Sequence, residues 1–494
     1  MSFSRDLANL ISTGATVYDT VSDLASASLN AGVMVVTKGY TTAGDGGGAT
    51  YLIEAAGADF DDVINHQLAN STVATLQYTD TLHAEQCGLY TGTNHDSAST
   101  LQTIVNFAQE NNLIVEIPAT FDIRLDSTVT FKHGKNGTDT VTYQPRINGN
   151  GAIIRCNHNG YCFKVVPRCT WADRATGRGD AYIEIRNIYF DGYFVTLNNY
   201  TSAKALVIGT HGYQCASLQI ADIENILVTG YLSEPIYLRS CRHMELAKVI
   251  TRDQSGGVKI ETTEEGFAGD VTFSGCAFSG NATRKPLHIT SSSSGSQGQC
   301  RGVHVTDCIF YGSGTKIEAL AGGQTADIWF ENCAWDGPNA PSGEHAIEVY
   351  AASTGVMRQV YFDNPYIVNF TGHAFKYTTD GTGDASQILI DSGRISSISD
   401  STSVIHIGDV GQFGIRGCDF DANTSTNEID IVAGASNYVS IQNNSSLSGN
   451  TTFINIGAGN DNFIVTGNCS KSTNTVSDNT SGANSVKANN FTMT

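Results

Sequence analysis

The chain has 494 residues, which exceeds the length of one ordinary globular domain. Only 15% of the residues are charged, 51 are glycine and 8 are proline, a composition typical of strands and turns rather than of disorder. The formal net charge of −20 argues against binding to nucleic acid or to an anionic membrane surface.

The 12 cysteines lack the spacing of a disulfide framework, and no Cys/His cluster has the spacing of a metal site. We therefore expect buried, reduced thiols, no metal and no cofactor. The first residues contain no apolar segment of signal-peptide length, and no run approaches a membrane span. We expect a protein that is made in a cytoplasm, does not insert into a membrane, and reaches the outside by another route.

The N-terminal part is predicted to form a short polar lead at 1–12 and a small module at 13–82. Residues 16–24 predict a strand and a short helix, while 33–40 and 42–51 predict two strands joined by a Gly-rich turn. This turn lacks the Lys-Ser/Thr pair and the following helix of a phosphate-binding loop, so we interpret it as a tight hairpin.

A solenoid is predicted for 83–470, and 471–494 are predicted to form an end cap or a trimer contact. Near its start, 97–110 predicts an N-capped helix. The helix has one apolar stripe, formed by Leu101, Ile104, Val105 and Ala108. We expect this helix to cover the open end of the solenoid, where an uncapped stack would expose strand edges.

The segment from about 180 to 470 repeats one motif with a spacing of 25 to 32 residues. Each copy reads apolar-x-apolar, two polar residues, and then a small or apolar residue. Strand patterns at this period, with almost no helical pattern, predict an all-β fold, a single-stranded parallel β-helix. Like residues should stack from turn to turn. The expected asparagine ladder contains Asn187, Asn225, Asn332, Asn364 and Asn443, and the cysteines at or near the inward ladder are Cys276, Cys308, Cys333, Cys418 and Cys469.

The N-terminal module carries a resemblance to a known family. Tyr-Asp-Thr-Val-x-Asp-Leu at 18–24, Val-x-Thr-Lys-Gly-Tyr at 35–40 and Ala-Gly-Asp-Gly-Gly-Gly at 43–48 resemble the module that precedes the β-helix in many bacteriophage tailspikes and tail fibres. Residues 82–121 are similar to the start of the pectate-lyase-like β-helix superfamily. The resemblance implies a right-handed β-helix, a homotrimer, attachment to a phage tail or baseplate protein, and a virion protein that acts on a bacterial surface polysaccharide. It also implies that a site can lie between subunits.

Outward side chains of successive turns form columns on the surface, because neighbouring strands lie about 4.8 Å apart. In the first strand of each repeat, one column contains Glu331, Asp363, Asp391 and Arg416, and a second contains His304, Trp329, Tyr361 and Leu389. Carboxylates beside aromatic rings suit a sugar. Glycosidic hydrolysis needs two carboxyl groups, about 5 Å apart for retention or about 6.5–9.5 Å apart for inversion.

We therefore predict that Glu331 and Asp363 act as the acid/base pair and that Asp391 orients water or substrate. Repulsion between the crowded carboxylates should raise the pKa of one of them. Trp329 and Tyr361 are predicted stacking platforms. His304 and Arg416 are predicted to contact the substrate.

An alternative groove is offered by the second strand of each repeat. Its predicted outward column contains Tyr237, Lys259, His288, Glu318, Glu348, Lys376, His406 and Asp430. Mixed signs also describe an ordinary ion-paired surface. If this column were the groove, Glu318 and Glu348 would be adjacent and act as acid and base, and a His or Lys base would suit a lyase. A cluster of Arg239, Arg242 and His243 would bind a uronate carboxylate.

Three functions follow from these patterns. The first is a phage tailspike that depolymerises a capsule, O-antigen or exopolysaccharide by hydrolysis with paired carboxylates. The second is a lyase that acts by β-elimination on a uronate polymer and leaves an ultraviolet-absorbing product. The third is a glycan-binding adhesin without catalysis. The excess of acidic over basic residues in the first column favours hydrolysis.

Overall fold

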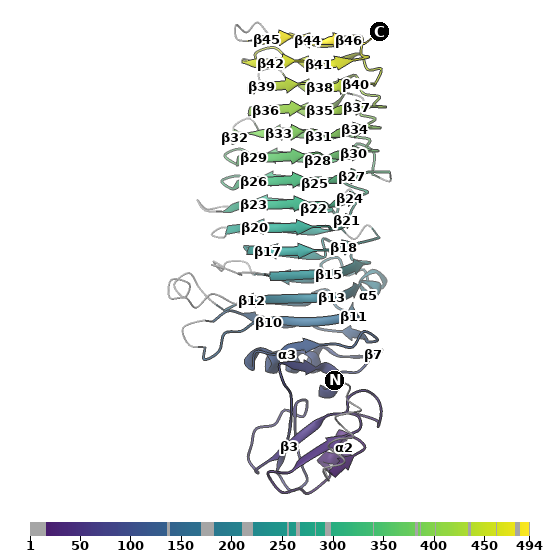
Figure 1. Ribbon diagram of the computed structural model, residues 1–494, viewed down its shortest axis with the longest axis vertical. Helices are drawn as coiled ribbons and strands as arrows, with labels where there is room; N and C mark the ends of the chain where they lie inside the picture. Colours follow the sequence, from purple (N-terminus) through teal and green to yellow (C-terminus); the bar gives the residue numbers. More distant parts are fainter. Residues whose placement is uncertain are drawn as a thin grey trace.

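The computed structural model describes residues 16–493 apart from 136–138, 169–181, 210–220, 254–255, 263–266, 282, 292–297, 339, 381–383, 386, 401, 433–435, 461 and 480–484. The predicted lead at 1–12 lies outside the described residues. A small sheet occupies one end of the molecule, and a tall stack of strands continues from it to the C-terminus (Figure 1).

The small sheet contains five strands in the order β1-β2-β3-β5-β4, with β1 and β2 parallel and the other pairs antiparallel. Its elements are β1 (Thr16–Tyr18), α2 (Val21–Ala25), β2 (Met34–Thr37), β3 (Thr50–Glu54), β4 (Asn65–Gln67) and β5 (Val73–Leu76). The Gly-rich segment joins β2 and β3 as a turn. Its backbone N–H groups at Tyr40, Thr41, Thr42 and Gly47 donate to the Asp45 carboxylate at 2.7–3.0 Å. Those donors are therefore occupied inside the turn.

From Thr81 onward the chain winds into a parallel β-helix, as the repeat predicts. One rung consists of β25 (Thr315–Ala319), β26 (Gln324–Glu331) and β27 (Ala334–Asp336). The next rung repeats this order with β28 (Ile347–Ala351), β29 (Val356–Asp363) and β30 (Tyr366–Val368). Each strand pairs in parallel with its counterpart on the neighbouring rung.

Three ladders of parallel strands form the walls of the solenoid. The first is a 13-stranded sheet of β10 (Val129–His133), β12 (Tyr161–Pro167), β14 (Lys204–Ile208), β16 (Ile236–Arg239), β19 (Val258–Thr262), β22 (Leu287–Ser291), β25, β28, β31 (Phe375–Thr379), β35 (Ser403–Ile407), β38 (Asn427–Ile431), β41 (Thr452–Ile456) and β44 (Asn474–Asp478). The second runs through β6 (Thr81–His83), β8 (Ile114–Glu116), β11 (Arg146–Cys156), β13 (Ile183–Asp191), β15 (Ala221–Thr229), β17 (Arg242–Ala247), β20 (Phe267–Ser274), β23 (Gln299–Thr306), β26, β29, β33 (Ile388–Asp391) with β32 (Asp384–Ala385), β36 (Val410–Arg416), β39 (Ser436–Gln442), β42 (Phe463–Thr466) and β45 (Ser485–Ala488). The third contains β7 (Gly92–Asp96), β9 (Asp122–Leu125), β18 (Ile250–Thr251), β21 (Ala277–Ser279), β24 (Ile309–Tyr311), β27, β30, β34 (Arg394–Ser396), β37 (Asp419–Asp421), β40 (Ser445–Ser446), β43 (Cys469–Ser470) and β46 (Phe491–Thr492).

The interior is filled by the inward side chains of successive rungs, which stack on one another. Phe330 and Phe362 lie parallel with ring centroids 5.0 Å apart, and Phe310 stacks on Trp335 at 5.1 Å. Burying such a side chain contributes about 1.5–3 kcal/mol. The ten described cysteines are free, and of the five predicted near the ladder only Cys469 is partly exposed.

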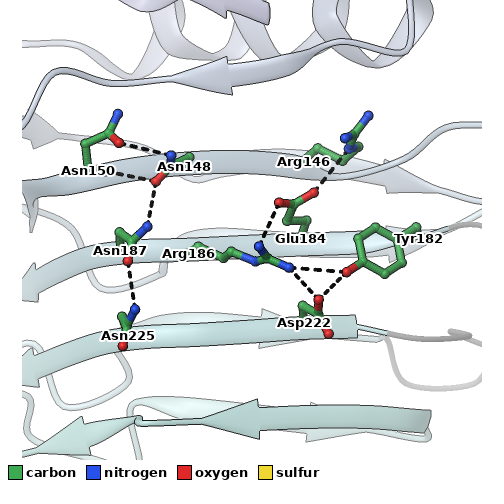
Figure 2. A network of polar contacts seen from close by, with 9 residues as sticks. All are labelled: Arg146, Asn148, Asn150, Tyr182, Glu184, Arg186, Asn187, Asp222 and Asn225. Carbon is green, nitrogen blue, oxygen red and sulfur yellow. Dashed lines mark hydrogen bonds and ion pairs between the residues drawn. The ribbon is translucent and has the colours of Figure 1, made fainter. Parts of the chain in front are cut away.

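A corner in the left-handed backbone region explains the asparagine ladder. The five predicted asparagines have φ between 50° and 57°, a conformation that asparagine adopts more readily than most residues. Four of these side chains also bond to an asparagine of a neighbouring rung, as Figure 2 shows for Asn187 and Asn225. Asn187 donates to Asn148 at 2.9 Å and Asn225 donates to Asn187 at 3.0 Å. Each corner therefore keeps the next one in register.

The first rungs are covered by helix α3 (Ala98–Glu110), and its predicted apolar stripe is buried. The helix also closes the edge of the 13-stranded sheet. Gln102 exchanges two hydrogen bonds with the backbone of Thr130 at 2.7 and 2.8 Å, and Gln109 does the same with Lys132 at 2.5 and 3.0 Å. These amides replace the neighbouring strand that β10 lacks on this side.

The other helical segments of the described residues are short, namely the 3-10 helix η1 (Ala84–Cys87) and α5 (Tyr193–Leu197). Within the described ranges, no helix has both the length and the apolar character needed to cross a membrane.

A pair of substitutions at Asn364 tests the role of the corner. Asn364→Ala should lower the stability by about 1–2 kcal/mol because alanine is strained at positive φ and lacks the amide bonded to Asn332. Asn364→Gly should cost less, because glycine adopts this φ freely. Thermal unfolding midpoints of the two variants would show this order, and equal midpoints would contradict it.

Candidate functional site

The strand register aligns the two outward columns that were predicted for the first strand of each repeat, a strand that belongs to the second ladder of the structure. Glu331 pairs with Asp363, Asp363 with Asp391, and Asp391 with Arg416 on successive rungs. The neighbouring column runs through His304, Trp329, Tyr361 and Leu389. Both columns lie on the second strand ladder, on β23, β26, β29, β33 and β36.

These residues surround a hollow of about 460 Å³, which we call the carboxylate hollow. Its lining consists of His304, Val305, Thr306, Trp329, Phe330, Glu331, Tyr361, Phe362, Asp363, Leu389, Asp391 and Arg416. The eight residues of the two predicted columns are all included. The volume lies in the range of small-molecule and sugar sites.

The same two columns carry a different chemistry nearer the N-terminus. There Arg146, Glu184, Arg186 and Asp222 alternate in sign and pair from rung to rung (Figure 2). Arg146 lies 3.3 Å from Glu184, and Arg186 bonds both Glu184 at 3.4 Å and Asp222 at 2.5 Å. Tyr182 donates a further hydrogen bond to Asp222. Both carboxylates of this group, Glu184 and Asp222, are therefore paired.

Glu331 and Asp363 differ from those lower residues. Both are exposed, and neither side chain has a hydrogen bond or ion pair with any other residue that the structure describes. Their carboxylates are free to bind a ligand. Because the two residues lie on adjacent rungs, their backbones are separated by about 4.8 Å.

The Asp391 carboxylate forms an ion pair with a residue of the next rung. The Arg416 guanidinium contacts its carboxylate at 2.8 and 2.5 Å, and these hydrogen bonds lower the pKa of Asp391. The repulsion expected among the three carboxylates is therefore relieved at Asp391 by Arg416. Arg416 also lies within electrostatic reach of Asp363.

The aromatic residues are arranged as a stack. The rings of Trp329 and Tyr361 lie 4.0 Å apart, and His304 is parallel to Trp329 at 6.2 Å. The Tyr361 hydroxyl donates to Gln387 at 2.8 Å. Each ring therefore covers one face of its neighbour. Trp329 is 44% exposed and lines the hollow.

The predicted alignment of the alternative column, on the 13-stranded sheet, was wrong at Glu318. His288 pairs with Lys316, and Lys316 pairs with Glu348, so Lys316 occupies the position predicted for Glu318. Glu318 lies two residues further along β25, opposite Tyr350. Glu318 and Glu348 are therefore not a directly stacked pair.

Glu318 is instead the centre of a buried ion-paired group. His288 and Lys316 contact its carboxylate at 2.6 and 2.5 Å. Burial raises the pKa of Glu318, but these hydrogen bonds outweigh it and lower the pKa to about 2. This geometry agrees with the interpretation of the alternative column as an ion-paired surface. It leaves Glu318 no free carboxylate for acid/base chemistry.

The predicted arginine cluster is also engaged in local contacts. The Arg239 guanidinium lies over the Tyr237 ring at 4.1 Å, and His243 lies 3.7 Å from Asp270. Tyr237 in turn donates to Glu261. Across the described part of the chain, no three His, Cys, Asp or Glu side chains are arranged to hold a metal ion.

Sequence analysis missed a second group of residues on the same strand ladder. Arg301, Gln324, Arg358, Gln359, Gln387 and Gln412 line a hollow of about 470 Å³ together with Ala326. Arg301, Gln324 and Arg358 lie before a bend in their strands. At this bend Asp327 and Gln359 have φ of 56° and 54°. Extending the repeat alignment upstream of this bend would have aligned Arg301 and Arg358, which are two rungs apart in one column.

Comparison with known proteins gives likenesses of fold. No family model and no curated protein matches the chain. Among solved structures it is similar to the tailspike of Acinetobacter phage vB_ApiP_P1, with 15% identity, a TM-score of 0.48, and coverage of 84% of this chain and 66% of that one. It is also similar to the tailspike of Acinetobacter phage vb_AbaP_AS12, with 13% identity, a TM-score of 0.49, and coverage of 95% and 75%.

A third likeness is to PfbA, a surface adhesin of Streptococcus pneumoniae, with 11% identity, a TM-score of 0.42, and coverage of 83% and 93%. The chain spans less than two thirds of the length of the first of these tailspikes. The parallel β-helix itself rests on the strand pairing of this chain.

Removing Arg416 tests the ion pair in the carboxylate hollow. In Arg416→Gln the pKa of Asp391 should rise toward its usual value, because the hydrogen bonds that favour the carboxylate are lost. A lowered pKa means that Asp391 stabilises the fold above about pH 4 and that this contribution is lost as the pH falls. An NMR titration of the side-chain carboxyl carbon measures the shift. Arg394→Gln, which removes a looser pair at 3.6 Å from Asp421, should leave Asp391 unchanged.

Glu318→Gln tests the corrected role of that residue. The variant should lose at most about 3 kcal/mol of stability near pH 7, because the carboxylate with its lowered pKa can no longer pair with its cations. The contribution is present above about pH 4.5 and disappears as the pH falls toward 2. Unfolding midpoints of variant and parent protein should therefore converge in acid. A difference of the same size at both pH values would show that the ion pairs are not its cause.

Proposed function

We propose that this protein is a phage tailspike that binds a bacterial surface polysaccharide and depolymerises it by hydrolysing a glycosidic bond. The observation that carries the proposal is a pair of carboxylates, Glu331 and Asp363, which have no partner within the described part of the chain and lie on adjacent rungs beside Trp329 and Tyr361. The resemblance of residues 18–48 to tailspike modules supports the phage assignment. The polymer would lie over the outer face of the second strand ladder.

In this mechanism one carboxyl group donates its proton to the glycosidic oxygen while the other attacks the anomeric carbon. Water then hydrolyses the glycosyl-enzyme bond, and the first carboxylate takes up a proton from it. A rung spacing of about 4.8 Å fits the retaining geometry of about 5–5.5 Å. We assign the attacking role to Asp363, which lies on the rung next to the Asp391–Arg416 ion pair. Glu331 is then the acid.

Asp391 and the aromatic stack have supporting roles in the proposal. Asp391 and Arg416 form a rigid polar pair that orients a sugar hydroxyl or the attacking water. Trp329 and Tyr361 offer ring edges and partly open faces to the C–H surface of the sugar. His304, above the Trp329 ring, bounds the same hollow.

The proposed assembly is a homotrimer on the virion, attached to the phage tail or baseplate through the module at 13–82 and acting at the bacterial surface. Large exposed apolar side chains occur on two walls of the last rungs. Tyr438, Ile464 and Val486 lie on the second strand ladder, Phe491 lies on the third and Leu447 follows β40 of the third, and all five are 43–61% exposed. Exposed apolar surface of this kind is typical of a contact between chains. It supports a trimer contact that includes the segment 471–494.

Substitution of the two carboxylates tests hydrolysis. Glu331→Gln and Asp363→Asn should each lower the release of reducing ends from the target polysaccharide by about 10²–10⁴-fold, because each removes one of two groups needed for acid/base and nucleophilic catalysis. Glu348→Gln is the matched control. It removes an acidic group on the 13-stranded sheet and should leave the rate unchanged.

The panel for this assay consists of purified bacterial capsules and O-antigens, followed by reducing ends and by ultraviolet absorbance. Rising absorbance would replace hydrolysis with β-elimination. Binding without either product would indicate an adhesin. Loss of activity in Glu348→Gln, with full activity in the other two variants, would move the site to the 13-stranded sheet.

A further inference from the structure

The carboxylate hollow continues into two further hollows on the same strand ladder. The middle hollow, of about 210 Å³, shares Leu389 and Arg416 with the carboxylate hollow. It also shares Gln387 and Gln412 with the hollow of about 470 Å³, which we call the basic hollow. Each hollow has lining residues in common with the next one, so we treat the three hollows as one groove.

The middle hollow lies along the continuation of the aromatic column. The column that begins with His304, Trp329 and Tyr361 continues through Leu389, Gly414 and Ser440. A Cβ atom added at Gly414 would lie only 2.7 Å from Cδ1 of Leu389. The Leu389 side chain therefore lies against the backbone of Gly414 and forms part of the floor between the hollows.

The two ends of the groove have opposite charge. In the basic hollow Arg301 is held by Asp327 at 2.8 Å, whereas Arg358 is exposed and has no acidic partner among the residues that the structure describes. Four glutamines surround the two arginines, and the lining includes no carboxylate. A chain of net charge −20 thus presents a free guanidinium inside a concave, amide-rich surface.

The basic hollow is separated from the carboxylates along the strand. Arg358 and Asp363 belong to the same strand, β29, and five residues of strand span at most about 17 Å. Because Arg358 and Glu331 line different hollows, a polymer in the groove would contact Arg358 with a different sugar residue from the one at Glu331. An anionic group at Arg358 would avoid the repulsion that it would meet beside Glu331 and Asp363.

We propose that the groove selects an anionic polysaccharide and that Arg358, supported by Arg301 and the glutamine amides, binds a carboxylate or phosphate group on a sugar remote from the cleaved bond. This inference rests on the proposed function for the polymer and its orientation. It names the substrate class that the same groove takes. Arg358 acts by binding substrate charge, and Glu331 and Asp363 act at the bond.

The test measures binding separately from cleavage. Acidic and neutral capsules and O-antigens are offered to the Glu331→Gln protein, which keeps the groove intact while slowing cleavage, and the Kd of each is measured at low and high salt. Each acidic polymer is paired with its carboxyl-reduced or dephosphorylated form, which separates the two anion sources. Arg358→Gln is compared with Arg252→Gln, an exposed arginine outside the three hollows.

The expected result is that the bound polymers are acidic and that neutralising the anion weakens binding. Arg358→Gln should weaken it about tenfold or more, and less at high salt, because a charge-assisted contact is lost. Arg252→Gln should bind normally. Selective binding of neutral polymers, binding of no polymer, or unchanged affinity in Arg358→Gln would overturn the inference. If Arg358→Gln loses affinity while Glu331→Gln still cleaves, the proposed hydrolysis fails and the anion site stands.

Discussion

The parallel hydrogen-bonded stacking of one rung on the next is the constraint on which the rest of this structure depends. Each rung must turn at the same place, and it does so through a single residue with φ near 55°, which explains why asparagine recurs at 187, 225, 332, 364 and 443. Once this corner is set, the strand that precedes it has no freedom of register. Every column of the repeat becomes a line of side chains on the surface, so a site can be built from residues about 30 positions apart in sequence.

The same geometry makes unpaired charge easy to recognise. On the lower rungs, Arg146, Glu184, Arg186 and Asp222 satisfy one another from rung to rung and form an ordinary polar wall. Higher on the same face, Glu331 and Asp363 have no such partners among the described residues, and aromatic rings replace the alternating charges. Only the side chains change, since the backbone scaffold continues without interruption. We attribute the proposed chemistry to this difference and not to the fold, because β-helices of one shape can carry unrelated sites.

Sequence alone predicted the columns that lie next to the corner and misplaced those further away. Glu331, Asp363 and Asp391 were aligned correctly because the polar corner residue and the small or apolar residue that follow each of them anchor their strand. Glu318 was misplaced because its strand has no such anchor, and a shift by two residues keeps the same inward and outward pattern. The basic hollow around Arg358 was missed because an additional bend at Gln359 separates it from the motif. Ring stacking of Trp329 on Tyr361 depends on contacts between rungs that no single strand encodes.

The account is tested most directly by a crystal structure of the Glu331→Gln protein with a bound oligosaccharide from its polymer. It predicts electron density for a glycosidic bond between residues 331 and 363, with the chain continuing over Gly414 and an anionic sugar at Arg358. Sugar bound instead over the 13-stranded sheet, at a boundary between subunits, or with its anionic group beside Asp363 would contradict the account.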